Sequence, residues 1–138
     1  MADKSILEVA KSQLIAFNVK NWGAAKEVLA ADTVYDEVAT QRNIQGVEEV
    51  ISAWKGWAKA FPDGKGSLDK ETVSGNTVVL ELTWRATQAG PLQLPGKDLA
   101  ATGKKVELRA CQIIEVSGDK VKSLRHYFDL SSLLRQLG

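Results

Sequence analysis

Cysteine and histidine, two side chains that commonly bind transition metals, are scarce in this sequence of 138 residues. Cys111 is the only cysteine, so the chain has no internal disulfide and no metal site built from several thiolates. His126 is the only histidine, which excludes every metal site that needs two histidine ligands. We therefore expect a protein that works without a metal.

An excess of one charge and a long apolar run are also lacking. Lysine and arginine number 18 against 17 aspartate and glutamate residues, a net charge of +1, which argues against nucleic acid as a partner. No apolar run approaches the roughly 18 residues of a membrane-spanning helix, so we expect no membrane partner. Residues 1–11 carry charges throughout and lack the apolar core of a signal peptide, which predicts a cytoplasmic protein.

The length fits one domain over residues 1–138, with no repeat or linker. Its first part has apolar residues at three- and four-residue steps, which predicts helices. Asp3 or Ser5 can cap the first helix, and Asn21 can cap a short second one. A third helix follows Gly46 and ends at residues 62–64. The three apolar stripes contain Ile6, Val9, Ala10, Leu14 and Phe17; Ala24, Ala25, Val28 and Leu29; and Val47, Val50, Ile51, Trp54, Trp57, Ala58 and Phe61.

Strands are predicted over residues 33–38 and again after Ser67, where apolar residues begin to alternate. A tight turn at residues 117–120 leads into a last strand from Val121 to about Asp129. Helices followed by antiparallel strands indicate an α+β fold. A curved sheet covered by helices leaves a cone with a cavity suited to a small apolar ligand. The alternating apolar faces are Val78, Leu80, Leu82, Trp84 and Ala86, and Val106, Leu108, Ala110, Ile114 and Val116.

Several short motifs, in order and in spacing, resemble the SnoaL-like polyketide cyclase family, within the nuclear transport factor 2-like, ketosteroid-isomerase-like superfamily. Each motif is weak alone, and together they extend over nearly the whole chain. They are Gly46-Val47-Glu48-Glu49-Val50, Ala60-Phe61-Pro62-Asp63, Thr87-x-x-Gly90-Pro91 with Thr102-Gly103-Lys104, Gly118-Asp119-Lys120-Val121, Tyr127-Phe128-Asp129, and Leu134-x-Gln136-Leu137-Gly138.

The resemblance implies a cone-shaped, curved antiparallel sheet covered by N-terminal helices. It also implies an enzyme without cofactors, either an isomerase or an aldol-type cyclase, that acts on a carbonyl-containing ligand in an apolar pocket. A carboxylate would remove a proton next to the carbonyl, because burial raises the pKa of a carboxyl group toward neutrality. Since one superfamily hosts many activities, a non-catalytic small-molecule binder or a dimeric interaction module stays an alternative.

Three residues are candidates for the acid/base role. Asp129 ends the last strand where the resemblance expects an acidic residue, although it can equally cap a C-terminal helix. Asp36 lies in the predicted strand 33–38, and a slip of one residue there decides whether Asp36 or Tyr35 faces the cavity. His126 is a candidate because an imidazole ordinarily titrates near neutrality. Strand alternation places His126 and Asp129 on opposite faces, so the two are alternatives and not a pair.

Five residues are candidates for binding substrate. Gln112 interrupts an apolar strand face, so it must find partners or be costly to bury. Tyr35 can donate to an oxyanion, and Trp57 and Trp84 can line a cavity for a flat ligand. Tyr127 alternates with Asp129 on the last strand. The cyclases of the family carry a histidine on the strand of Gln112, and this sequence has none there.

The segment 89–101 is long, contains glycine and proline, and has exposed-looking leucines, so we expect a lid over the pocket mouth. The outward positions Val79, Thr83, Cys111 and Ile113 are apolar for a solvent-facing sheet surface. We therefore expect a homodimer through the outer face of the sheet, as in relatives.

Overall fold

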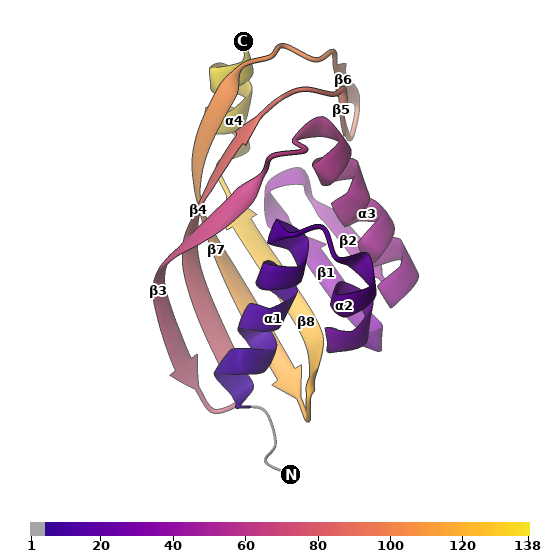
Figure 1. The fold of residues 1–138 in the computed structure, drawn as a ribbon, viewed down its shortest axis with the longest axis vertical. Helices are drawn as coiled ribbons and strands as arrows, with labels where there is room; N and C mark the ends of the chain where they lie inside the picture. The colour runs from indigo at the N-terminus through magenta and orange to yellow at the C-terminus, as the bar shows by residue number, and fades with distance from the viewer. Residues whose placement is uncertain (1–4) are drawn as a thin grey trace.

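A computed structural model describes residues 5–138 and has helices packed on one side of a curved sheet (Figure 1). The α+β prediction is confirmed. In chain order the elements are α1 (Ile6–Asn18), α2 (Trp22–Val28), β1 (Leu29–Glu37), the 3-10 turn η1 (Val38–Thr40), β2 (Arg42–Gln45), α3 (Val47–Ala60), β3 (Lys65–Ser74), β4 (Thr77–Thr87), β5 (Leu92–Leu94), β6 (Lys97–Leu99), β7 (Lys105–Ser117), β8 (Lys120–Phe128) and α4 (Leu130–Leu137).

The helices begin where their capping residues predict. The Ser5 hydroxyl accepts from the backbone N–H of Glu8 at 3.1 Å, while Asp3, the other candidate, lies outside the described residues. Asn21 caps α2 by accepting from Ala24 N–H at 3.0 Å. The strand that follows begins at Leu29, whereas the sequence predicted a start at residue 33. The reason is that α2 has only two turns and passes directly into β1.

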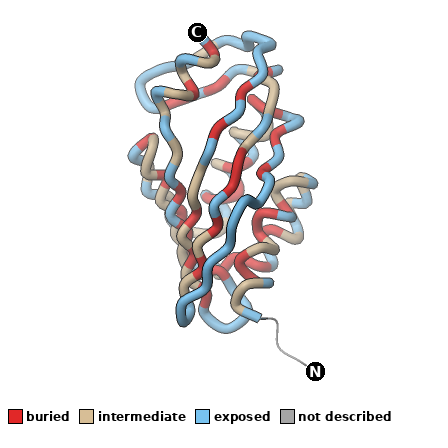
Figure 2. The backbone as a smooth tube through the Cα atoms, turned by 90° about the vertical axis from the view of Figure 1, so that its left-hand side faces the viewer, coloured by how far each residue is buried: buried red, intermediate tan, exposed pale blue. Residues whose placement is uncertain are grey.

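The large sheet has the strand order β2-β1-β8-β7-β4-β3. Neighbouring strands are antiparallel as expected, with one exception: β1 and β8 run parallel. This pairing places β1 beside the last strand of the chain, so side chains from residues 33–37 and 121–126 meet on one sheet. Buried positions recur along the strands and on the facing sides of the helices (Figure 2).

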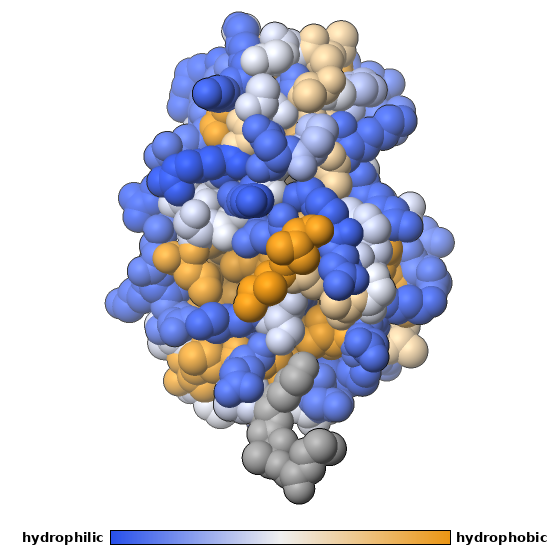
Figure 3. All heavy atoms as spheres, viewed as in Figure 1, coloured by the Kyte–Doolittle hydropathy of each residue, from blue (hydrophilic) through white to orange (hydrophobic). Residues whose placement is uncertain are grey.

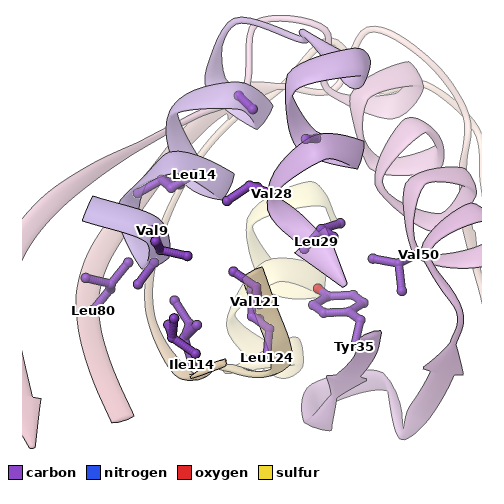
Figure 4. Packing of buried hydrophobic residues seen from close by; sticks show 14 of the residues in the cluster. Val9, Leu14, Val28, Leu29, Tyr35, Val50, Leu80, Ile114, Val121 and Leu124 are labelled. Atoms are coloured by element: carbon purple, nitrogen blue, oxygen red, sulfur yellow. The ribbon is translucent and has the colours of Figure 1, made fainter. Parts of the chain in front are cut away.

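Two hydrophobic clusters fill the interior. In the larger one, Val9 and Leu14 of α1 point toward Leu80, Ile114 and other strand residues (Figure 4). The smaller cluster lies at the end of the molecule formed by α4, the β5–β6 hairpin and the end of α3 (Figure 1). Its buried members are Ala60, Phe61, Leu92, Leu94, Val106, Leu108, Leu133 and Leu137.

Segment 89–101 contains the two-stranded β5–β6 hairpin. Leu92 and Leu94, which were expected to be exposed, are buried in the smaller cluster. A lid over the pocket mouth stays a prediction. The pattern Leu92-Gln93-Leu94 directs both leucines to one face, as in any strand. Gly96 turns the hairpin with a φ of +72°, a conformation that glycine adopts without strain.

Exposed apolar surface gathers on α1 (Figure 3). Ile15 is 59% and Val19 is 66% exposed, on the side of the helix that faces away from the sheet. Single apolar side chains are normal on protein surfaces. The apolar stripe on the opposite side of α1 packs into the core.

Candidate functional site

A cavity of about 90 Å³ is lined by residues of both hydrophobic clusters. Aromatic rings make up much of its wall: Phe17, Trp54, Trp57, Phe61, Trp84 and Phe128. The rings meet mostly edge to face, as the quadrupoles of aromatic side chains prefer. Four polar side chains interrupt this wall: Gln13, Tyr35, Gln112 and His126.

A chain of hydrogen bonds leads from the cavity to a buried carboxylate. The His126 ring nitrogen Nδ1 lies 2.8 Å from the Tyr35 hydroxyl, which lies 2.9 Å from Oε2 of Glu37. The parallel pairing of β1 with β8 makes this contact possible, because it sets His126 opposite Glu37 in the strand register. On the other side of the imidazole, the Trp84 indole N–H donates to Nε2 at 3.2 Å.

Glu37 is fully buried and ionised. Burial alone would raise its pKa, but the Thr40 hydroxyl, the charge and N–H groups of Arg42, and the Trp57 indole hold the pKa of Glu37 below its usual value. The Arg42 guanidinium donates from Nη2 at 2.7 Å and from Nε at 3.0 Å, both to Oε1. The carboxylate therefore acts only as an acceptor at neutral pH.

This network determines the tautomer of His126. Since the Glu37 carboxylate can only accept, the Tyr35 hydroxyl must donate its single proton to Glu37. Burial and the nearby Glu37 raise the pKa of Tyr35 well above its usual range, so the phenol keeps that proton. The Tyr35 oxygen then accepts from Nδ1–H of His126, which leaves Nε2 unprotonated, as the donor Trp84 requires.

His126 is neutral at physiological pH. Burial lowers its pKa from 6.5 to about 4, and the Glu37 charge opposes this shift only in part. The result is an imidazole at the cavity wall, whose Nδ1–H is held in place through Tyr35 and whose Nε2 accepts from the Trp84 indole. Such a group can accept a proton, and the imidazolium formed would interact favourably with Glu37.

A second polar pair bridges α1 and β7 at the cavity. The side-chain amide of Gln13 donates from Nε2 to Oε1 of Gln112 at 2.8 Å. Both side chains line the cavity, and Gln112 is the neighbour of His126 across the β7–β8 pair. Polar groups on adjacent strands of one sheet face can act on the same ligand.

The cavity thus brings together five of the residues singled out in the sequence: Tyr35, Trp57, Trp84, Gln112 and His126. The register of β1 places Tyr35 on the cavity side.

The remaining three candidates lie elsewhere. Asp36 is on the opposite face of β1, because neighbouring strand residues alternate. Asp129 was expected to reach the pocket, but it is exposed and caps α4 by accepting from Ser131 N–H at 3.1 Å. Tyr127, two residues before it, is 40% exposed and lies on the outer face beside Cys111.

Glu37 and Gln13 were not identified from the sequence. The signal for Glu37 was present in the alternation: once Tyr35 faces inward, so does the residue two positions later. Gln13 lies on the apolar stripe of α1, four residues after Val9 and four before Phe17. A polar side chain on such a stripe marks a buried hydrogen bond.

Within residues 5–138, no group of three or more histidine, cysteine, aspartate or glutamate side chains is arranged to hold a metal ion. None of the helices in that part of the chain has the length and hydrophobicity needed to span a bilayer.

Known structures share this fold. A putative SnoaL-like polyketide cyclase from Jannaschia sp. CCS1 superposes with a TM-score of 0.86 at 16% identity, over 99% of this chain and 97% of that one. AclR, a putative hydroxylase from Streptomyces galilaeus, gives 0.80 at 20% identity, over 96% and 95% of the two chains. An epoxide hydrolase of the LEH-like type from M. tuberculosis gives 0.76 at 17% identity, over 96% and 88%.

Similarity at these identities concerns the fold, which is the ketosteroid isomerase-like fold. No curated protein sequence matches the chain. The profile of the SnoaL-like polyketide cyclase family, however, matches residues 8–137 and so confirms the resemblance over nearly the whole length. The chain belongs to the SnoaL-like polyketide cyclase family.

Proposed function

We propose that this protein is a cofactor-independent acid/base enzyme that acts on a small, mainly apolar carbonyl compound, with His126 as the general base. The observation that carries the proposal is the fixed tautomer of His126, a residue of the cavity wall whose unprotonated Nε2 is held only by the Trp84 indole N–H. The family and its fold support an enzyme of this type.

In the first step, Nε2 takes a proton from the carbon next to the substrate carbonyl. The electrons of the broken C–H bond form a C=C bond, and the carbonyl oxygen becomes an enolate oxygen. In an isomerase the imidazolium returns the proton to another carbon. In an aldol-type cyclase the enolate carbon attacks a second carbonyl of the same molecule, and the new alkoxide takes the proton from Nε2.

Tyr35 and Glu37 are positioning residues in this scheme. Tyr35 holds Nδ1–H, and the Glu37 charge stabilises the imidazolium through the phenol. Of the three candidates for the base, His126 is the one that lines the cavity, whereas Asp129 and Asp36 do not. The oxygens of Glu37, the nearest carboxylate, are already occupied by Thr40, Arg42, Trp57 and Tyr35.

Two N–H groups are available for the enolate oxygen. The bond from Trp84 to Nε2 is long, at 3.2 Å, and substrate binding must break it. The indole N–H is then free to donate to the substrate oxygen. The Gln112 amide, adjacent to His126 on the sheet, is the second donor. Donors aimed at developing negative charge in a dry site are a large part of catalysis.

The test is exchange of carbon-bound hydrogen in D₂O, followed by proton NMR with butanone, cyclopentanone and pentane-2,4-dione as substrates. We expect wild-type protein to accelerate exchange next to the carbonyl. His126→Gln should lower the rate by about 100-fold or more, the usual contribution of a general base. Circular dichroism must show that the variant is folded.

Asp129→Asn is the matched control, because Asn also caps helices and Asp129 lies away from the cavity. It should exchange at the wild-type rate. An undiminished rate in folded His126→Gln, or no exchange with any of the three ketones, would sink the proposal. Ligand binding without exchange would instead identify the alternative, a non-catalytic binder on the same fold.

A further inference from the structure

The Gln13–Gln112 pair is only half satisfied by the protein. A single hydrogen bond joins the two amides, from Gln13 Nε2 to Gln112 Oε1. The other two atoms, Gln13 Oε1 and Gln112 Nε2, have no hydrogen-bond partner among residues 5–138. Neither is sealed in the packing, since no fully enclosed side-chain nitrogen or oxygen in that range lacks a partner.

The pair lies in strongly apolar surroundings. Gln13 is only 1% and Gln112 only 4% exposed. Leu80, the cross-strand neighbour of Gln112, and Val9, one turn before Gln13, are fully buried. Both glutamines line the cavity, so the open space that their free atoms touch is the cavity.

A purely structural role does not require two amides here. Two leucines of similar size would fill the same space without leaving a donor and an acceptor unpaired. The pair also has a property that holds for either orientation of the two amides. If both are turned over, the hydrogen bond reverses, and one N–H₂ group and one carbonyl oxygen still face the cavity.

We infer that Gln13 and Gln112 form a recognition site for a ligand that carries a hydrogen-bond donor and an acceptor close together, and that the ligand class is therefore the hydroxycarbonyl compounds. The ligand carbonyl accepts from the free N–H₂ group, and the ligand hydroxyl donates to the free carbonyl oxygen. Gln13 is the specificity-determining residue, because in the amide orientation that the structure shows its Oε1 is the acceptor that a simple ketone cannot use.

This inference rests on the proposed function for the identity of the cavity as a substrate site, but it concerns binding alone. The cavity, at about 90 Å³, is smaller than the roughly 150 Å³ that accommodates benzene in an engineered protein cavity. A small acyclic ligand is therefore the suitable probe, since it does not require the aromatic wall to move.

The test compares hydroxyacetone with butanone, which have equal numbers of heavy atoms and differ in the hydroxyl. Dissociation constants are measured by NMR, from shifts of the side-chain amide signals and of the His126 ring protons. Using His126→Gln as well as wild-type protein separates binding from turnover. We expect hydroxyacetone to bind about fivefold to tenfold more tightly than butanone, the contribution of one additional hydrogen bond.

Gln13→Leu should abolish this preference, and the double variant Gln13→Leu/Gln112→Leu should also show none while remaining folded. Gln93→Leu, which changes an exposed glutamine of β5, is the matched control and should keep the preference. Equal affinities in the wild type, failure of both probes to bind, or a preference that survives in Gln13→Leu would each overturn the inference. Loss of exchange activity with the preference intact would instead refute the proposed function alone.

Discussion

Between pH 7 and pH 5, acid should destabilise this protein mainly through one group, His126. The imidazole is neutral in the folded state, with a pKa lowered by burial to about 4, whereas in the unfolded chain it returns to about 6.5. The unfolded state therefore binds the extra proton first, and stability falls as the pH falls from 6.5 toward 4. Each pKa unit corresponds to about 1.4 kcal/mol, so the full loss is about 3 kcal/mol, of which about 2 kcal/mol falls between pH 7 and pH 5.

Urea unfolding measured at intervals between pH 7.5 and pH 4.5 gives this loss directly. Because His126 is the only histidine, a protein without an affinity tag shows one set of imidazole signals, whose NMR titration reports the pKa of His126 without ambiguity. The carboxylates, including Glu37 with its lowered pKa, add their own losses at lower pH. In His126→Gln the slope between pH 7 and pH 5 should disappear. A flat stability profile in the wild type, or an imidazole that titrates near 6.5, would refute the buried network on which the site depends.

Two further predictions follow from the same geometry. Glu37→Gln should reduce the free energy of unfolding by about 3 kcal/mol, measured in urea, because it leaves the Arg42 charge without its anion; a loss below 1 kcal/mol would contradict the ion pair. Leu133→Ala, in the wall formed by α4, should destabilise by about 2–5 kcal/mol and enlarge the cavity, so that cyclohexanone binds more tightly than in the wild type; unchanged binding would place Leu133 away from the ligand.

The fold could be predicted from the sequence because its elements carry clear periodic signals. The apolar stripe of α3 and the alternating faces of β4 and β7 each match their burial in the structure. Local signals did not reveal the parallel pairing of β1 with β8, because it joins segments about 90 residues apart and depends on the whole sheet. That pairing sets Glu37 opposite His126, so the hydrogen-bond chain that joins these two residues could not be predicted from local patterns.

The failure at Asp129 has a different cause. A carboxylate between the end of a strand and the start of a helix satisfies two local patterns at once, a strand residue facing the cavity and an N-cap. The backbone at Asp129 leaves the strand just before α4, and the side chain turns to the N–H of Ser131. The cap depends only on a residue two positions away. Whether Asp129 faces the pocket depends on how β8 pairs with strands far away in the sequence. Sequence alone therefore could not choose between the cap and the pocket.

The arrangement around Glu37 fits the proposed function of the buried network better than a role in stability. Replacing a buried ion pair with apolar residues is often neutral or stabilising, so stability alone does not favour a carboxylate here. Glu37 nevertheless receives hydrogen bonds from Thr40, Arg42 and Trp57, which keep the carboxylate ionised. The Tyr35 hydroxyl therefore donates its proton to Glu37. A group that fixes one phenol proton fixes one histidine tautomer, and the Nδ1–H tautomer leaves Nε2 of His126 as an acceptor, which the Trp84 indole occupies. In the proposed function, the chain from Glu37 to His126 holds a neutral base in place.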